Sequence, residues 1–199
     1  MNELRRLTRE FFSRDTVLVG KDLLGKYIVR KTAKGRMIGK VIEVEAYLGP
    51  KDKACHCYNY KKTEKTKIMY MKPGTLYVYY IYGTYFCLNV ITEPEGFPCS
   101  IFIRNLYPID GIELMKDNRN VKVGKNYKNL ADGPSKLCMA MKITKEKFNG
   151  KDSCAENSVL FFTEGEKIDD KQILLGKRIG IDYAEEDKDR LLRFILNEE

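Results

Sequence analysis

The chain has 199 residues, of which 43% are hydrophobic, and a formal net charge of +8. This length and composition suit one globular domain with a hydrophobic core and exclude a largely disordered chain. No apolar run approaches the roughly 20 residues of a membrane helix, and the polar stretch 1–9 lacks the apolar core of a signal peptide. We therefore expect a cytoplasmic protein with no membrane association. The positive charge is typical of proteins that bind a polyanion, although many basic proteins bind no nucleic acid.

The first predicted elements are two short helices. Thr8 is placed to cap a helix that includes Phe11 and Phe12, and Asp15 is placed to cap a second helix that Gly25 ends. Side-chain oxygens at cap positions accept hydrogen bonds from the free N–H groups of the first helical turn. We therefore expect helical structure before the first strand.

Strands and a basic loop follow these helices. Segments rich in β-branched and aromatic residues predict strands at 27–30, 37–47, 75–82 and 85–91. A turn at 33–36 joins the first two strands, and a turn around Gly83 joins the last two. Between the two pairs, residues 51–67 are polar and basic and predict a solvated loop.

The C-terminal half predicts further strands at 101–106, 159–163 and 177–181. Pro108 is placed to start one helix and Gly133-Pro134-Ser135 to open another, with a basic loop at 121–129 between them. The apolar positions of these two helices are Ile112, Leu114 and Met115, and Leu137, Cys138 and Met141. The tail, residues 187–199, fits either a helix or a strand.

The predicted strands outnumber the helices and do not alternate regularly with them. This order indicates an α+β fold with a largely antiparallel, curved sheet, flanking helices and a protruding β-hairpin. No repeat or linker divides the sequence, so we expect residues 1–199 to form a single compact domain.

Two carboxylates lie near the end of strand 37–47. Because side chains alternate along a strand, Glu43, Glu45 and Tyr47 share one face with Val41. The opposite, apolar face consists of Ile42, Val44 and Ala46. Glutamates beside a turn could supply a general base that reaches water or substrate, or they could form an ordinary solvated acidic face.

The hairpin around Gly83 is the most aromatic stretch of the chain. Tyr77 and Tyr79 share a face, and Tyr82 lies beside the turn, where it would project from the tip. Tyrosine rings can stack on nucleic-acid bases, and a residue at a hairpin tip can enter a DNA groove. Tyrosines also pack well inside sheets, so the composition alone leaves both interpretations open.

A zinc site is one interpretation of Cys55-His56-Cys57. Zinc modules usually carry paired cysteines two to four residues apart, and His56 is the only histidine in the sequence. The other cysteines lie far along the chain, so the spacing argues against a metal.

Four segments resemble signatures of the alkyladenine (3-methyladenine) DNA glycosylase family. They are Glu43-Val44-Glu45-Ala46-Tyr47-Leu48-Gly49-Pro50 with Asp52, Ala54 and His56; Met71 to Tyr79 with Tyr82, Gly83 and Asn89; Gly133 to Cys138; and Arg178-Ile179-Gly180-Ile181. They occur in order along nearly the whole chain, and the first two are long and specific.

The resemblance implies roles for individual residues. Glu45 is similar to the general base that activates a water for attack on C1′ of the sugar, and Arg104 and the carbonyl of Ile179 resemble the groups that hold that water. The residues that resemble the walls of the base pocket and their support are Tyr47, His56, Tyr77 and Tyr79. Asn89 is similar to the residue that disfavours the amino group of normal guanine, and Tyr82 looks like the wedge in the minor groove.

The same resemblance implies a monofunctional, base-excising hydrolase that needs no metal or other cofactor. Its partner would be double-stranded DNA containing damaged purines, which would place it at the nucleoid, and we expect a monomer. Two alternatives remain: a nucleic-acid-binding module without catalysis, and a tRNA-directed enzyme on a similar scaffold. A zinc nucleobase deaminase would require H-x-E and P-C-x-x-C, and neither occurs.

Overall fold

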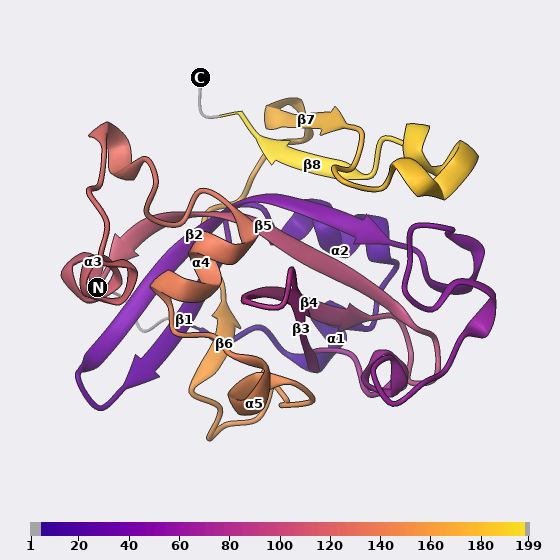
Figure 1. Ribbon diagram of the computed structural model, residues 1–199, viewed down its shortest axis with the longest axis horizontal. Helices are drawn as coiled ribbons and strands as arrows, with labels where there is room; N and C mark the ends of the chain where they lie inside the picture. The colour runs from indigo at the N-terminus through magenta and orange to yellow at the C-terminus, as the bar shows by residue number, and fades with distance from the viewer. Residues whose placement is uncertain (1–4, 198–199) are drawn as a thin grey trace.

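The strands of the computed structural model, which describes residues 5–197, form one curved antiparallel sheet (Figure 1). Along the sheet the order is β3-β4-β5-β2-β1-β6, while β8 pairs with β2 and carries β7. The strands are β1 (Tyr27–Thr32), β2 (Gly35–Tyr47), β3 (Leu76–Ile81), β4 (Tyr85–Thr92), β5 (Cys99–Asp110), β6 (Leu160–Thr163), β7 (Ile173–Gly176) and β8 (Arg193–Leu196). The predicted α+β fold with an antiparallel sheet is confirmed. Residues 1–4 of the polar N-terminal stretch and 198–199 of the tail lie outside the described part.

Short helices flank the sheet. The α-helices are α1 (Arg9–Phe12), α2 (Thr16–Leu23), α3 (Ile112–Arg119), α4 (Pro134–Ala140) and α5 (Lys145–Phe148). Single 3₁₀ turns and one longer 3₁₀ segment occupy Gly49–Lys51, Tyr58–Tyr60, Lys67–Tyr70, Lys125–Tyr127, Asp170–Gln172 and Asp182–Asp189. The carboxylate of Asp15 accepts a hydrogen bond from the Leu18 N–H over 3.0 Å, and Gly25 follows the helix with a φ of +79°. Both predicted ends of α2 are therefore confirmed.

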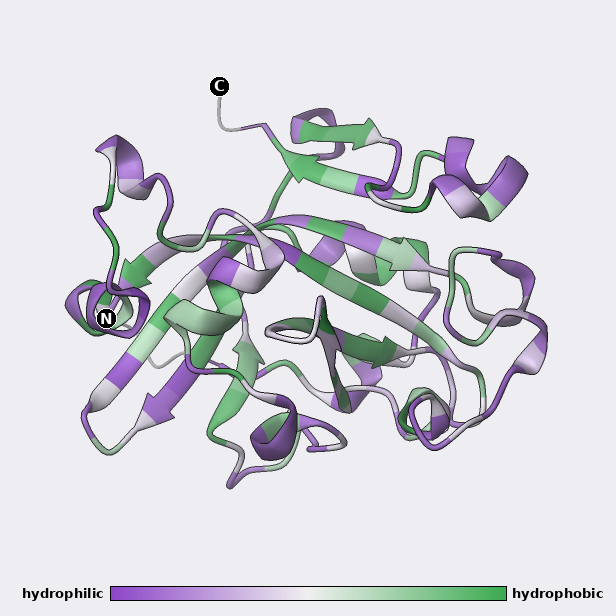
Figure 2. Ribbon diagram, viewed as in Figure 1, coloured by the Kyte–Doolittle hydropathy of each residue, from purple (hydrophilic) through white to green (hydrophobic). Residues whose placement is uncertain are grey.

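The hydrophobic core follows the strands. Figure 2 shows apolar residues concentrated along the strands and polar residues along the outer loops. Helix α2 packs against β2 and β5, and α4 packs against β4 and β5. Within residues 5–197, no helix has the length and apolar composition needed to cross a bilayer.

Two of the predicted elements lie elsewhere in the structure. Pro108 lies inside β5, and α3 begins only at Ile112, after Gly111, where a Cβ would collide with the carbonyl oxygen of Arg36. Residues 177–181 form no strand. The strand in this part of the chain is β7, which ends earlier, at Gly176. In the tail, which fitted either a helix or a strand, residues 193–196 form strand β8.

The predicted solvated loop at 51–67 is wrong in its first half. Asp52, Ala54, Cys55 and Cys57 are all buried there, and only the lysine-rich second half is largely exposed. A polar and basic composition indicates exposure on average, but the buried ion pair of Asp52 with Arg178 draws this segment inward.

A bulge corrects the predicted faces of β2. Val41 pairs with Leu106 of β5 and Glu43 pairs with the adjacent Asn105, so Ile42 is an extra residue. The alternation breaks at a bulge. Val41 consequently joins Val44 in the main core instead of sharing the face of the two glutamates.

We predict that Phe194→Ala lowers the free energy of unfolding by about 3–5 kcal/mol, as expected when a large core side chain is truncated. The Phe194 ring is 1% exposed and lies so close to Gly20 that a Cβ there would be 2.9 Å from it. Chemical denaturation measures the change. Leu174→Ala on the neighbouring strand β7 is the control, since this side chain is half exposed and should change stability by no more than about 0.5 kcal/mol. Equal effects of the two substitutions would contradict the packing described.

Candidate active site

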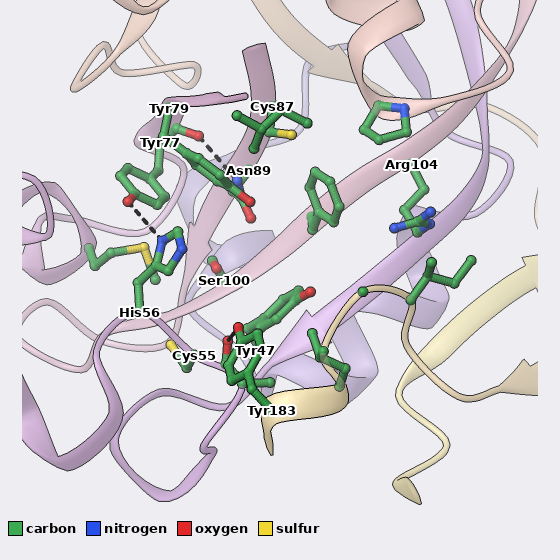
Figure 3. A pocket seen from close by; sticks show the side chains of 18 of the residues that line it. Tyr47, Cys55, His56, Tyr77, Tyr79, Cys87, Asn89, Ser100, Arg104 and Tyr183 are labelled. Atoms are coloured by element: carbon green, nitrogen blue, oxygen red, sulfur yellow. Dashed lines mark hydrogen bonds between the residues drawn. The ribbon is translucent and has the colours of Figure 1, made fainter. Parts of the chain in front are cut away.

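A cavity of about 380 Å³ lies where β2, the β3–β4 hairpin, β5 and the segment after β7 meet (Figure 3). This volume lies within the usual range of small-molecule sites. Its lining includes Tyr47, His56, Tyr77, Tyr79, Tyr82, Asn89, Ser100, Phe102, Arg104, Ile179 and Tyr183. All the site residues predicted from the sequence line this cavity except Glu45, which is buried beside it.

Glu45 is held by groups from three parts of the chain. Its Oε1 accepts the backbone N–H of Ile179 over 2.8 Å and lies 3.2 Å from Nη1 of Arg104. Its Oε2 accepts the hydroxyl of Tyr47 over 3.0 Å. Glu45 has no exposed surface, so the solvated acidic face that the sequence left open does not exist at this residue. The resemblance assigned the carbonyl of Ile179 to the attacking water, and that role stays a prediction, while the N–H of the same residue is the group that contacts Glu45.

Burial and neighbouring charges act on Glu45 in opposite directions. Burial raises the pKa of Glu45, while Arg104, the Ile179 N–H and the Tyr47 hydroxyl favour the ionised form. The net direction is upward. Glu45 is therefore a stronger base than a surface glutamate, and it is held in one orientation.

A buried ion pair between Asp52 and Arg178 supports this arrangement. Nη1 and Nη2 of Arg178 contact the two oxygens of Asp52 over 2.5 and 2.8 Å, and Nη1 also donates to the carbonyl of Ala46. The guanidinium lies 4.8 Å from the ring centroid of Tyr47. Both residues belong to segments that resemble the family signatures, yet they are 126 positions apart in the sequence, so no local pattern indicated that they pair. The pair draws residues 52–57 inward and fixes Ile179, the next residue after Arg178, against Glu45.

Aromatic rings form two sides of the cavity. Figure 3 shows Tyr47 across the cavity from His56 and Tyr79. The ring centroids of His56 and Tyr79 are 4.8 Å apart, and Nδ1 of His56 lies 3.0 Å from the hydroxyl of Tyr77. Asn89 is 4% exposed and its amide donates to the carbonyl of Tyr77 over 3.4 Å. A flat group could lie between Tyr47 on one side and His56 with Tyr79 on the other.

The hairpin places Tyr82 at the rim of this cavity. Its side chain is 90% exposed, the largest exposure of any large hydrophobic residue in the described part of the chain. Tyr82 has a φ of +50° and Gly83 a φ of +70°, so the turn projects the ring outward. The predicted position at the hairpin tip is confirmed.

The cysteines near the cavity are buried thiols. Cys55 and Cys57 pack in a small cluster with Met69 and Tyr77, and each of the six cysteines is free. Among residues 5–197, no three His, Cys, Asp or Glu side chains gather in a way that could hold a metal ion.

We predict that His56 titrates far below an ordinary histidine. Burial, with Lys65 and Lys61 nearby, lowers its pKa to about 4. Because it is the sole histidine, its imidazole signal in a proton NMR titration is unambiguous, and the midpoint should lie near 4 instead of the usual value of about 6.5. Between these values the unfolded chain binds the extra proton, so the free energy of unfolding should fall as the pH drops through this range. A midpoint near the usual value would mean that the ring is solvated.

A family model described as "Methylpurine-DNA glycosylase (MPG)" matches residues 10–199. A protein of Clostridium novyi is 47% identical over 98% of this chain and 96% of its own length. Proteins of Clostridium acetobutylicum and Natranaerobius thermophilus are 44% and 42% identical, covering 96% and 97% of this chain and 94% and 96% of their own lengths. All three carry the name "Putative 3-methyladenine DNA glycosylase".

Proposed function

The chain belongs to the methylpurine-DNA glycosylase family, and on that premise we propose that it hydrolyses the N-glycosidic bond of damaged purines in duplex DNA and leaves an abasic site. The observation that supports this proposal most directly is the burial of Glu45. Its carboxylate is fully buried beside a cavity walled by aromatic rings.

In the proposed reaction, a water oxygen bonds to C1′ of the sugar while the bond from C1′ to the purine nitrogen breaks. The electron pair of that bond leaves with the purine, and Glu45 accepts the proton of the water. The charge of Glu45 also stabilises the oxocarbenium-like transition state. Arg104 and the backbone of Ile179, which flank one oxygen of Glu45, are placed to orient the water. Because the nucleophile is water, the base is released without cutting the strand.

The cavity suits an alkylated purine. Alkylation at N3 or N7 makes the ring cationic, so the base can leave without first being protonated. The electron-rich faces of Tyr47 and Tyr79 favour a cationic ring over a neutral one. The low pKa of His56 keeps its ring neutral, so this wall does not repel a cation. We propose that Asn89, buried at the back of the cavity, disfavours the amino group of normal guanine.

A base inside a duplex can reach this cavity only when it is flipped out of the stack. Tyr82, exposed at the rim, is placed to fill the space that the flipped base leaves. The net charge of +8 favours binding to the phosphate backbone. We propose that residues 1–199 act as one domain and as a monomer, since the described residues supply the base, the pocket walls and the wedge.

Glu45→Gln is predicted to abolish base release while lesion-containing DNA is still bound. Loss of a general base lowers a rate by roughly 10²–10⁴-fold, and loss of the carboxylate charge adds to this. Excision is measured on duplex oligonucleotides with a single lesion, using alkaline cleavage to reveal abasic sites, and binding is measured by fluorescence anisotropy. Near-normal excision by this variant would show that Glu45 is not the base. Binding to alkylated DNA without any abasic sites from the wild type would instead indicate a binding module.

Tyr82→Ser should weaken excision from a fully paired duplex far more than excision of the same lesion opposite a mismatch. Flipping costs a few kcal/mol of unstacking and unpairing, and a ring that fills the gap offsets part of that cost. Tyr79→Ser is the matched comparison, because Tyr79 faces the cavity and its loss should affect both substrates similarly. Equal losses on both substrates for Tyr82→Ser would rule out the wedge role.

A further inference from the structure

Arg104 lies between two carboxylates on the same face of β2. Its Nε donates to Oε1 of Glu43 over 3.1 Å, and its Nη1 lies 3.2 Å from Oε1 of Glu45. The side chain of Glu45 is fully buried, while those of Arg104 and Glu43 are only 13% and 18% exposed. One guanidinium therefore contacts two carboxylates, each through a different nitrogen.

The strand register explains how Arg104 reaches both. Glu43 pairs with Asn105 and Val44 pairs with Ile103, so Arg104 has no partner in β2 and forms a bulge in β5. A bulged residue leaves the regular alternation of its strand, and its side chain is redirected. Here the side chain is directed at the face of β2 that carries the two glutamates.

A second arginine restrains Glu43 from the outer side. Arg193 of β8 is the backbone partner of Glu45, and its Nη1 lies 3.8 Å from the same oxygen of Glu43 that Arg104 contacts. Glu43 does not line the cavity. It is therefore placed to act on Arg104 and not on a bound base.

We propose that Glu43 is a positioning residue that restricts Arg104 to a single contact with Glu45. This inference rests on the proposed role of Glu45 as the base. A free guanidinium and a carboxylate favour two parallel hydrogen bonds, which would occupy both oxygens of Glu45. The hydrogen bond from Nε to Glu43 fixes the guanidinium in an orientation in which only Nη1 contacts Glu45. Because Tyr47 takes only one site on Oε2, Glu45 keeps a lone pair for the proton of the water.

The charge of Glu43 also bears on the pH at which Glu45 ionises. The charged and titratable groups that face Glu45 are Glu43 and Tyr47 on β2, Tyr79 on β3, Cys87 on β4, Arg104 on β5, Arg178 after β7, and Arg193 on β8. Removing the negative charge of Glu43 leaves Arg104 to act on Glu45 alone, which lowers the pKa of Glu45. A base works when deprotonated, so the acidic limb of the pH–rate profile should move to lower pH.

The test compares Glu43→Ala and Glu43→Gln with the wild type in single-turnover excision of 3-methyladenine, whose ring is already cationic, across a range of pH. Glu43→Ala should lower the maximal rate by about 10²-fold, the effect of a misplaced catalytic group, and move the acidic limb to lower pH. Glu43→Gln should recover most of the rate, because its amide oxygen can still accept from Nε, and keep the displaced limb. Glu164→Ala, which removes a surface glutamate paired with Lys26, should match the wild type.

Equal loss of rate in Glu43→Ala and Glu43→Gln, or an acidic limb that stays in place or moves upward, would overturn the positioning role. Glu45→Gln in the same assay separates this failure from that of the proposed function. If Glu45→Gln still excises the base, the role of Glu45 is wrong whatever Glu43 does. If Glu45→Gln is inactive and both Glu43 variants match the wild type, only the positioning role is wrong.

Discussion

Burial of the Glu45 carboxylate is the constraint on which the rest of the site depends. An ionised carboxylate removed from water loses several kcal/mol of solvation, and nearby donors and positive charges must compensate. Arg104, the Ile179 N–H and the Tyr47 hydroxyl supply this compensation directly. These groups need partners of their own, because an unpaired buried arginine would be as unfavourable as an unpaired glutamate. The ion pair of Arg178 with Asp52 is thus part of the same balance, and the polar network extends from β2 to β5 and the C-terminal segment.

The same constraint has a chemical consequence. Charges in a low-dielectric site interact more strongly than charges in water, and fixed dipoles do not have to reorganise during the reaction. The site therefore gains its electrostatic strength from an arrangement that is unfavourable for folding by itself. The apolar core beneath it supplies the stability, and Phe194 of β8 packs against Gly20 of α2 where the C-terminal segment joins that core.

Sequence patterns predicted the elements whose structure is determined locally. The cap at Asp15, the two hairpins and the tip position of Tyr82 follow from turn residues and period-two alternation, and the structure confirms them. The errors lie where a distant partner decides the structure. Residues 51–67 are polar and 177–181 are apolar enough for a strand, yet the contact of Asp52 with Arg178 draws the first segment inward and turns the second across the end of β2. The resemblance named the residues around the cavity, but no local pattern showed that Glu45 is buried or that Arg104 sits in a bulge.

The hairpin tip is also unfavourable for folding, but its cost comes from backbone strain and an exposed ring, not from burial of a charge. A turn with positive φ at both central residues favours Asn-Gly, because glycine and asparagine tolerate the left-handed region. This turn has Tyr82 in the first of these positions, with a φ of +50° and almost all of its side chain in solvent. A bulky residue there is strained, by about 1–3 kcal/mol, and its exposed ring gains nothing from packing. Asn-Gly would form the same turn without this strain. The carbonyl of Tyr82 accepts a hydrogen bond from the hydroxyl of Thr84, but the exposed ring does not offset the strain, so the compensation for the ring is expected from a partner. The proposed wedge role would supply such a partner, since a gap between stacked bases is flat and apolar and suits a tyrosine ring.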